Sequence, residues 1–173
     1  FELNPTMPPE GTASAPYLKA KYGLSDEQLK TNAARIAERG AAAGFVFGTR
    51  THIWGTLDAH RLLLWAAGEG QPAGAPLALK RALLAAYHRD GKNPSDHGVL
   101  LALVAGVGLS VEGARTLLQG DQLTQEVRAL EAEWQAKGIT GVPAVVVNDQ
   151  YVIAGGQPPA MYERALRQMA AGT

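Results

Sequence analysis

The sequence contains no cysteine. These residues therefore cannot form a disulfide, a cysteine-ligated zinc site or a thiolate nucleophile. Histidine is scarce as well, with four side chains at positions 52, 60, 88 and 97. The closest two, His52 and His60, have a spacing that matches no common pattern of zinc ligands. We therefore predict no metal site.

Net charge and long apolar runs are also absent. Sixteen basic and sixteen acidic residues give a formal net charge of zero, which argues against nucleic acid as a partner, because a polyanion requires a basic surface. No run approaches the 18 apolar residues of a membrane span, so no membrane partner is expected. The opening FELNPTMPPEG has neither the basic start nor the apolar core of a signal peptide.

The length and hydrophobic fraction of the chain are those of a packed domain. Its 173 residues are 46% hydrophobic, which suffices for one core with a sizeable insertion. Strand patterns are confined to the two ends, while the segment FVFGTRTHIWG is ambiguous and could be extended. Helical patterns fill the middle. Helices bracketed by strands indicate an α/β domain that carries a helical insertion.

The C-terminal part, TGVPAVVVNDQYVIAGGQP, has the pattern of a β-hairpin. Two short apolar runs, 144–147 and 151–154, flank the turn-forming Asn148-Asp149-Gln150. Pro143 cannot donate to a sheet ladder, so it belongs at the start of a strand, at an edge or at a bulge. A helix is expected from Pro159 onward.

Three of the expected helices have recognisable sequence features. Ser25 and Gln28 stand at capping-box positions before an apolar stripe, and Thr56 is a plausible cap for the helix LDAHRLLLWA. Within that helix, Asp58 and Arg61 have the spacing of a local ion pair with a structural role. A long helix is expected over DQLTQEVRALEAEWQAKG, with Leu123 on its apolar face.

The order FELNP, LDAHRLL, EGARTLL and GITGVPAVVVNDQYVIAGGQP resembles the DsbA-family oxidoreductases, specifically their FrnE-like branch. The resemblance covers essentially the whole chain. It implies a thioredoxin-like fold with a large all-helical insertion. Residues 1–16 would end the N-terminal thioredoxin-like portion, 17–138 would form the helical insertion, and 139–173 would complete the fold.

The resemblance also reveals a departure. Members of the family place a strand and a Cys-x-x-C helix before the segment FELNP, and neither is present here. We expect the fold to be incomplete at its N-terminus, the redox cysteines to lie upstream of Phe1, and this chain alone to be redox-inert. The strands at 1–3 and 144–147 would then lack a neighbour, which favours a dimer or strand exchange. The branch generally lacks signal sequences, so a cytoplasmic location is expected.

The implied activity is thiol–disulfide exchange on protein or peptide thiols and disulfides. Sequence alone leaves the Val142–Pro143 bond cis or trans, and the resemblance implies cis. Gly141, Val142 and Pro143 would then form the substrate-binding face, with Val142 offering its backbone to an extended peptide. No cofactor is expected.

Three further residues have alternative interpretations. Gln157 lies in a loop that binds glutathione in some relatives of this fold, although a glycine-enabled turn explains the loop equally simply. His60 would either tune the thiolate or be a packed histidine, which we favour. Phe45 would either line the substrate groove or anchor the insertion.

Two other functions remain open. One is a glutathione-dependent isomerase or transferase of the 2-hydroxychromene-2-carboxylate isomerase type, which shares this architecture and uses serine in place of cysteine. The residue upstream distinguishes it from the oxidoreductase. The other is a non-catalytic protein that binds extended peptides without turnover.

Overall fold

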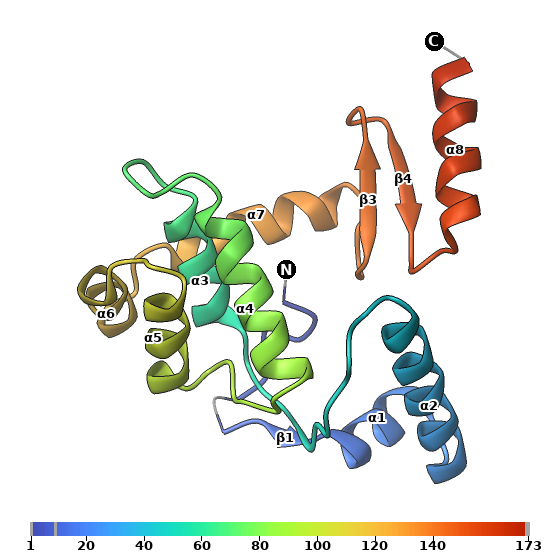
Figure 1. Cartoon of the computed structure of the whole chain (residues 1–173), viewed down its shortest axis with the longest axis horizontal. Helices are drawn as coiled ribbons and strands as arrows, with labels where there is room; N and C mark the ends of the chain where they lie inside the picture. Colours follow the sequence, from blue (N-terminus) through green and yellow to red (C-terminus); the bar gives the residue numbers. More distant parts are fainter. Residues whose placement is uncertain (1, 9, 172–173) are drawn as a thin grey trace. The chain divides into compact units, whose positions relative to one another are not determined.

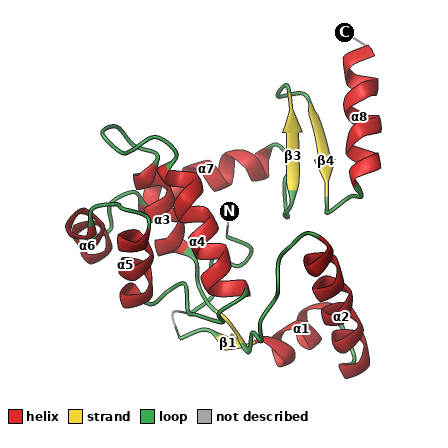
Figure 2. Ribbon diagram, viewed as in Figure 1, coloured by secondary structure: helices red, strands yellow, loops and turns green. Residues whose placement is uncertain are grey.

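The structure is a computed structural model that describes residues 2–8 and 10–171. It divides into two compact units, Phe1–Arg128 and Ala129–Thr173, and each is described here by itself. Within these described residues helices predominate, together with four short strands (Figure 2). This composition confirms the predicted α/β class with a large helical part.

The first unit begins with a short two-stranded ladder. Strand β1 (Thr12–Ala13) pairs antiparallel with β2 (His52–Ile53), so only two residues of the ambiguous segment FVFGTRTHIWG form a strand. Gly11 precedes β1 with φ at +72°, and a Cβ there would lie 2.4 Å from the Trp54 ring. Only glycine fits this close approach.

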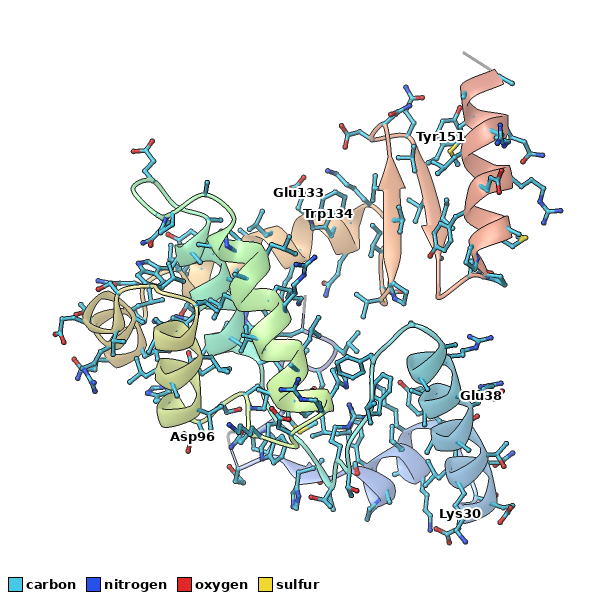
Figure 3. All side chains as sticks on the ribbon, viewed as in Figure 1. Lys30, Glu38, Asp96, Glu133, Trp134 and Tyr151 are labelled. Carbon is cyan, nitrogen blue, oxygen red and sulfur yellow. The ribbon has the colours of Figure 1, made fainter. Side chains whose placement is uncertain are left out.

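Two helices follow β1. Helix α1 covers Ser14–Tyr22 and α2 covers Asp26–Ala42, as labelled in Figure 1. The predicted capping box is confirmed: Ser25 Oγ accepts from the Gln28 N–H, and the Gln28 side chain accepts from the Ser25 N–H. In α2 only Gly40 is buried, and Figure 3 shows the charged side chains of Lys30 and Glu38 projecting from it.

Four helices build the core of the first unit. They are α3 (Leu57–Ala66), α4 (Ala75–His88), α5 (His97–Gly106) and α6 (Val111–Gln119). Each contributes at least one side chain that is fully or almost fully buried, and the largest of these are Leu62, Leu79, Leu100 and Val104. Burial of one such side chain stabilises the fold by about 1.5–3 kcal/mol.

Arg61 is buried in this helical core, with only 4% of its side chain exposed. The predicted pair with Asp58 is confirmed, with Nη1 2.7 Å from Oδ1. The same guanidinium donates to the carbonyls of Leu117 and Gly120 at 2.6 Å, and its Nε donates to the Gln122 carbonyl at 2.7 Å. Because one carboxylate and three backbone carbonyls accept hydrogen bonds from the Arg61 guanidinium, its buried positive charge is compensated.

The second unit contains the hairpin and the last helix. Helix α7 (Thr124–Ala136) includes the boundary between the units, and β3 (Ala144–Val147) and β4 (Tyr151–Ala154) follow it. The strands pair antiparallel from Ala144↔Ala154 to Val147↔Tyr151, which confirms the predicted hairpin. They form a two-stranded sheet. Helix α8 covers Pro159–Ala171.

The turn of this hairpin has an unusual backbone. Asn148 has φ at 52° and Asp149 has φ at 55°. Two successive left-handed residues match the twist of antiparallel strands, and Asn and Asp tolerate this conformation better than other non-glycine residues. The sequence Asn-Asp therefore accounts for the tight connection.

Three local predictions were wrong. No strand is present at Glu2 or Leu3, since neither residue pairs with another strand in the described part of the chain; the Glu2 carboxylate contacts Arg128 and the Thr56 N–H, and Phe1 lies outside the described residues. Thr56 precedes α3 without a side-chain cap bond. Leu123 lies before α7 with φ at 63°, so it is not on the helix face.

Two possible functional features are absent from the described part of the chain. No helix there is long and apolar enough to cross a membrane. No group of three or more His, Asp or Glu side chains within residues 2–8 and 10–171 could hold a metal ion.

Candidate functional site: the Val142–Pro143 loop

The loop before β3 starts from a well-fixed helix end. The Lys137 Nζ lies 2.6 Å from a Glu133 carboxylate oxygen and 4.5 Å from the centre of the Trp134 ring; Figure 3 labels Glu133 and Trp134 on α7. Gly138 has φ at +84°, and the Ile139 N–H donates back to the Trp134 carbonyl at 3.0 Å. The helix thus ends in a glycine cap, and the loop leaves from a defined position.

Val142 is the exposed centre of the loop. Its residue surface is 56% exposed, and the Val142–Pro143 peptide bond is cis, the isomer that the resemblance implies. Within the described part of the chain, neither the N–H nor the C=O of Val142 has a hydrogen-bond partner. Both groups are free to pair with another extended chain.

Pro143, which follows Val142, is hydrogen-bonded to the hairpin through its carbonyl. The last regular pair of the ladder is Ala144 with Ala154. One residue further out, the Gly155 N–H donates to the Pro143 carbonyl at 2.8 Å. This bond continues the pairing of the two strands by one residue, so that Val142 is the first position without a partner.

A shallow cavity of about 300 Å³ lies beside this loop. Its lining is mostly apolar and comes from the loop that follows α7, both strands and the residue after β4: Gly138, Ile139, Thr140, Gly141, Val142, Pro143, Ala144, Val152, Ala154 and Gly155. Three of the predicted binding residues, Gly141, Val142 and Pro143, therefore line one cavity. An apolar side chain presented by a bound peptide would fit this lining.

Gln157 does not line this cavity, but it acts on its border. The Gln157 Nε2 donates to the Ala154 carbonyl at 2.9 Å. The Tyr162 hydroxyl, from α8, donates to the Gly155 carbonyl at 3.2 Å. Both side chains therefore fix the loop that follows β4. No sequence pattern pointed to Tyr162, because its contact depends on how α8 packs.

The two other predicted residues, His60 and Phe45, belong to the first unit. His60 lies on α3 and is partly buried. Phe45 follows α2, where its ring centre is 4.8 Å from that of Phe47, and its N–H donates to the Gly40 carbonyl at 2.8 Å. These contacts favour the interpretation of Phe45 as an anchor between α2 and the segment after it.

The aromatic contacts continue from Phe47 to His88 on α4, with ring centres 5.8 Å apart. Partial burial lowers the pKa of the His88 imidazole, and the positive charges of Arg50 and Lys80 lower it further. Burial raises the pKa of the neighbouring Tyr87 hydroxyl, against the opposing effect of Arg50. These groups form a packed cluster that ties the 45–54 segment to α4.

A second cavity, of about 350 Å³, lies within the first unit. Four polar lining residues pair with one another: His97 Nε2 is 2.8 Å from Asp58 Oδ2, and Arg128 pairs with Glu2. Because these side chains already have partners, the cavity offers a ligand less than the free backbone at Val142 does.

Comparison with known proteins agrees with this geometry. Residues 1–167 match the family model described as DSBA-like thioredoxin domain. The chain is also similar to the crystal structure of a probable DsbA oxidoreductase from Streptomyces coelicolor, with a TM-score of 0.90 and 32% sequence identity. That match covers 100% of this chain and 74% of the other. A search of curated proteins found no match.

Proposed function

Because the chain belongs to the DSBA-like thioredoxin domain family, we propose that it binds the substrate in a thiol–disulfide oxidoreductase of the FrnE-like branch. The substrates are protein or peptide dithiols and disulfides. The observation that carries this proposal is the free N–H and C=O of Val142 beside an apolar cavity. A peptide that pairs there adds as a β-strand, so its backbone is recognised more than its side chains.

The redox step requires two cysteines, and the 173 residues contain none. The proposal places that pair upstream of Phe1. An enzyme thiolate attacks a substrate disulfide to form a mixed disulfide, which the second enzyme thiol resolves. Two electrons and two protons pass to the substrate, and the reverse direction oxidises a substrate dithiol. The loop at Val142 holds the peptide through the mixed-disulfide stage.

Absence of cysteine makes peptide binding directly testable. In a Thr140→Cys variant, the single thiol stands in the cavity lining and is exposed. The variant is equilibrated with a cysteine-containing extended peptide in a glutathione buffer, and the mixed disulfide is quantified by intact mass. Gln168→Cys, exposed on α8 away from this cavity, is the matched control. Capture of cystamine by both variants corrects for thiol reactivity.

We expect the peptide to be captured about tenfold more at position 140 than at 168, which corresponds to roughly one or two net hydrogen bonds. Methylation of the peptide nitrogen that donates to Val142 should remove the preference. Equal capture at both positions, or full capture of the methylated peptide, would contradict strand-like binding.

The redox part has its own test. The protein is isolated from its natural source, reduced, treated with iodoacetamide and measured by intact mass. Uptake of two carbamidomethyl groups is expected. A protein without alkylation would contradict the oxidoreductase proposal and would leave peptide binding or an isomerase reaction as the function.

A further inference from the structure

Three hydrogen bonds fix the backbone at the end of β4, at Ala154 and Gly155. Gly155 uses both of its polar groups: its N–H donates to the Pro143 carbonyl at 2.8 Å, and its C=O accepts from the Tyr162 hydroxyl at 3.2 Å. Next to it, the Ala154 carbonyl accepts from Gln157 Nε2 at 2.9 Å. A continuous chain of contacts therefore leads from α8, through Gly155, to the residue that follows Val142.

Gly155 is the weak point of this chain of contacts. Its φ of +77° is a left-handed conformation that glycine adopts easily but also leaves easily. The N–H that donates to Pro143 belongs to the Ala154–Gly155 peptide, and the carbonyl that Tyr162 holds belongs to the following Gly155–Gly156 peptide. Without a partner for that carbonyl, the second peptide is free to rotate about the Gly155 Cα, and the first peptide loses part of the restraint that aims its N–H at Pro143. A hydroxyl on the carbonyl restricts this rotation.

Tyr162 is placed for this role. Its side chain is partly buried, on a helix that has no fully buried residue within the described part of the chain. Its ring alone could supply packing, but its hydroxyl ends on a backbone carbonyl in the loop that borders the cavity. Phenylalanine would keep the packing and lose only this bond.

We propose that Tyr162, assisted by Gln157, is a positioning residue for substrate binding. It acts through Gly155 to hold Pro143 against β4, and this keeps the free N–H and C=O of Val142 in the orientation that an added strand requires. The inference rests on the proposed function, because it assumes that Val142 pairs with the substrate.

The test introduces Tyr162→Phe into the Thr140→Cys background. The matched control is Tyr151→Phe, because Tyr151 is 42% exposed on the same hairpin and its hydroxyl has no hydrogen-bond partner within the described residues. Capture of the extended peptide and of cystamine is measured for each variant in the full chain, together with the hydrogen-exchange rate of the Gly155 amide.

We expect Tyr162→Phe to lower peptide capture by about threefold to tenfold, the effect of one hydrogen bond. Cystamine capture should stay unchanged, and the Gly155 amide should exchange faster. A purely structural role would lower stability without separating the peptide from the small disulfide. Tyr151→Phe should change none of these quantities.

The possible failures are distinguishable. Peptide preference at position 140 that survives Tyr162→Phe, with unchanged Gly155 exchange, would overturn the positioning role and leave the proposed function intact. No peptide preference in Thr140→Cys itself would contradict the proposed function, and the role of Tyr162 would fall with it.

Discussion

The imidazole Nε2 of His97 lies 2.8 Å from Oδ2 of Asp58 and joins the start of α5 to the first turn of α3. The second oxygen of the same carboxylate lies 2.7 Å from Nη1 of the buried Arg61. Asp58 is thus the shared partner of one half-exposed imidazole and one buried guanidinium. This arrangement predicts that its two partners differ in their contribution to stability.

Asp58→Asn should lower the free energy of unfolding by about 3 kcal/mol, because it leaves the Arg61 charge buried without a counter-charge. His97→Gln should cost less than about 1 kcal/mol, since that partner is exposed to solvent. Urea denaturation of the two variants beside the unmodified chain measures the difference. An equal decrease in unfolding free energy for both variants would contradict a larger contribution of the Asp58–Arg61 pair to stability.

Gly48 should not tolerate a side chain. A Cβ at this position would lie 1.9 Å from the Arg89 carbonyl oxygen, a backbone atom that cannot move alone. We expect Gly48→Ala to destabilise the chain by about 2 kcal/mol, as an overpacked site does. The control is Gly106→Ala in α5, where a Cβ meets nothing within 4 Å. That change should stabilise by about 0.5–1 kcal/mol; a stabilised Gly48→Ala would refute the clash.

Two substitutions of one residue in the hairpin turn should change the unfolding free energy in opposite directions. Asp149 has φ at 55°, which glycine adopts freely and a β-branched residue strongly resists. Asp149→Gly should raise the unfolding free energy by up to about 1 kcal/mol, and Asp149→Val should lower it by more than that. Thermal unfolding monitored by circular dichroism tests both. The same sign for both variants would be inconsistent with the left-handed turn.

His88 predicts a pH dependence. Because burial lowers its pKa in the folded state, the unfolded chain binds more protons between the folded-state pKa and the ordinary value of about 6.5. Its contribution to stability is therefore present above pH 6.5 and is lost as the pH falls toward the folded-state pKa. His88→Phe, which keeps an aromatic ring beside Phe47, should reduce this loss.

The measurement is the unfolding free energy of both proteins at pH 8 and pH 5. The difference between these values should be smaller in His88→Phe, whereas the comparison at pH 8 isolates any change in packing. An identical pH dependence in both proteins would show that His88 does not titrate on unfolding.

Local sequence patterns predicted the local structure well. The capping box at Ser25 and the pair of Asp58 with Arg61 each join residues three positions apart. The hairpin around Asn148 joins two strands that a single turn connects. Such contacts form from short-range geometry that the sequence states directly. The order of predicted helices and strands indicated the α/β class, and the family resemblance added the thioredoxin-like fold.

Contacts between distant residues were not predictable in the same way. The Thr56 hydroxyl was expected to cap α3 and makes no such bond, whereas the Thr56 N–H donates to Glu2, 54 positions away, a contact that no local pattern indicates. The site shows the same division. Gly141, Val142 and Pro143 line one cavity as consecutive residues would, whereas the contact of Tyr162 with Gly155 depends on the packing of α8 against the loop. No sequence spacing encodes that packing.

Arg61 has a consequence for how the sequence can vary. Apart from Asp58, all of its partners are main-chain carbonyls, at Leu117, Gly120 and Gln122. Carbonyls are the same in every residue, so the end of α6 and its connection to α7 can change side chains without losing these bonds. The arginine has no such freedom, because no other side chain offers five donors in a fixed plane. Among natural variants, substitutions should therefore accumulate at the connection and be rare at position 61.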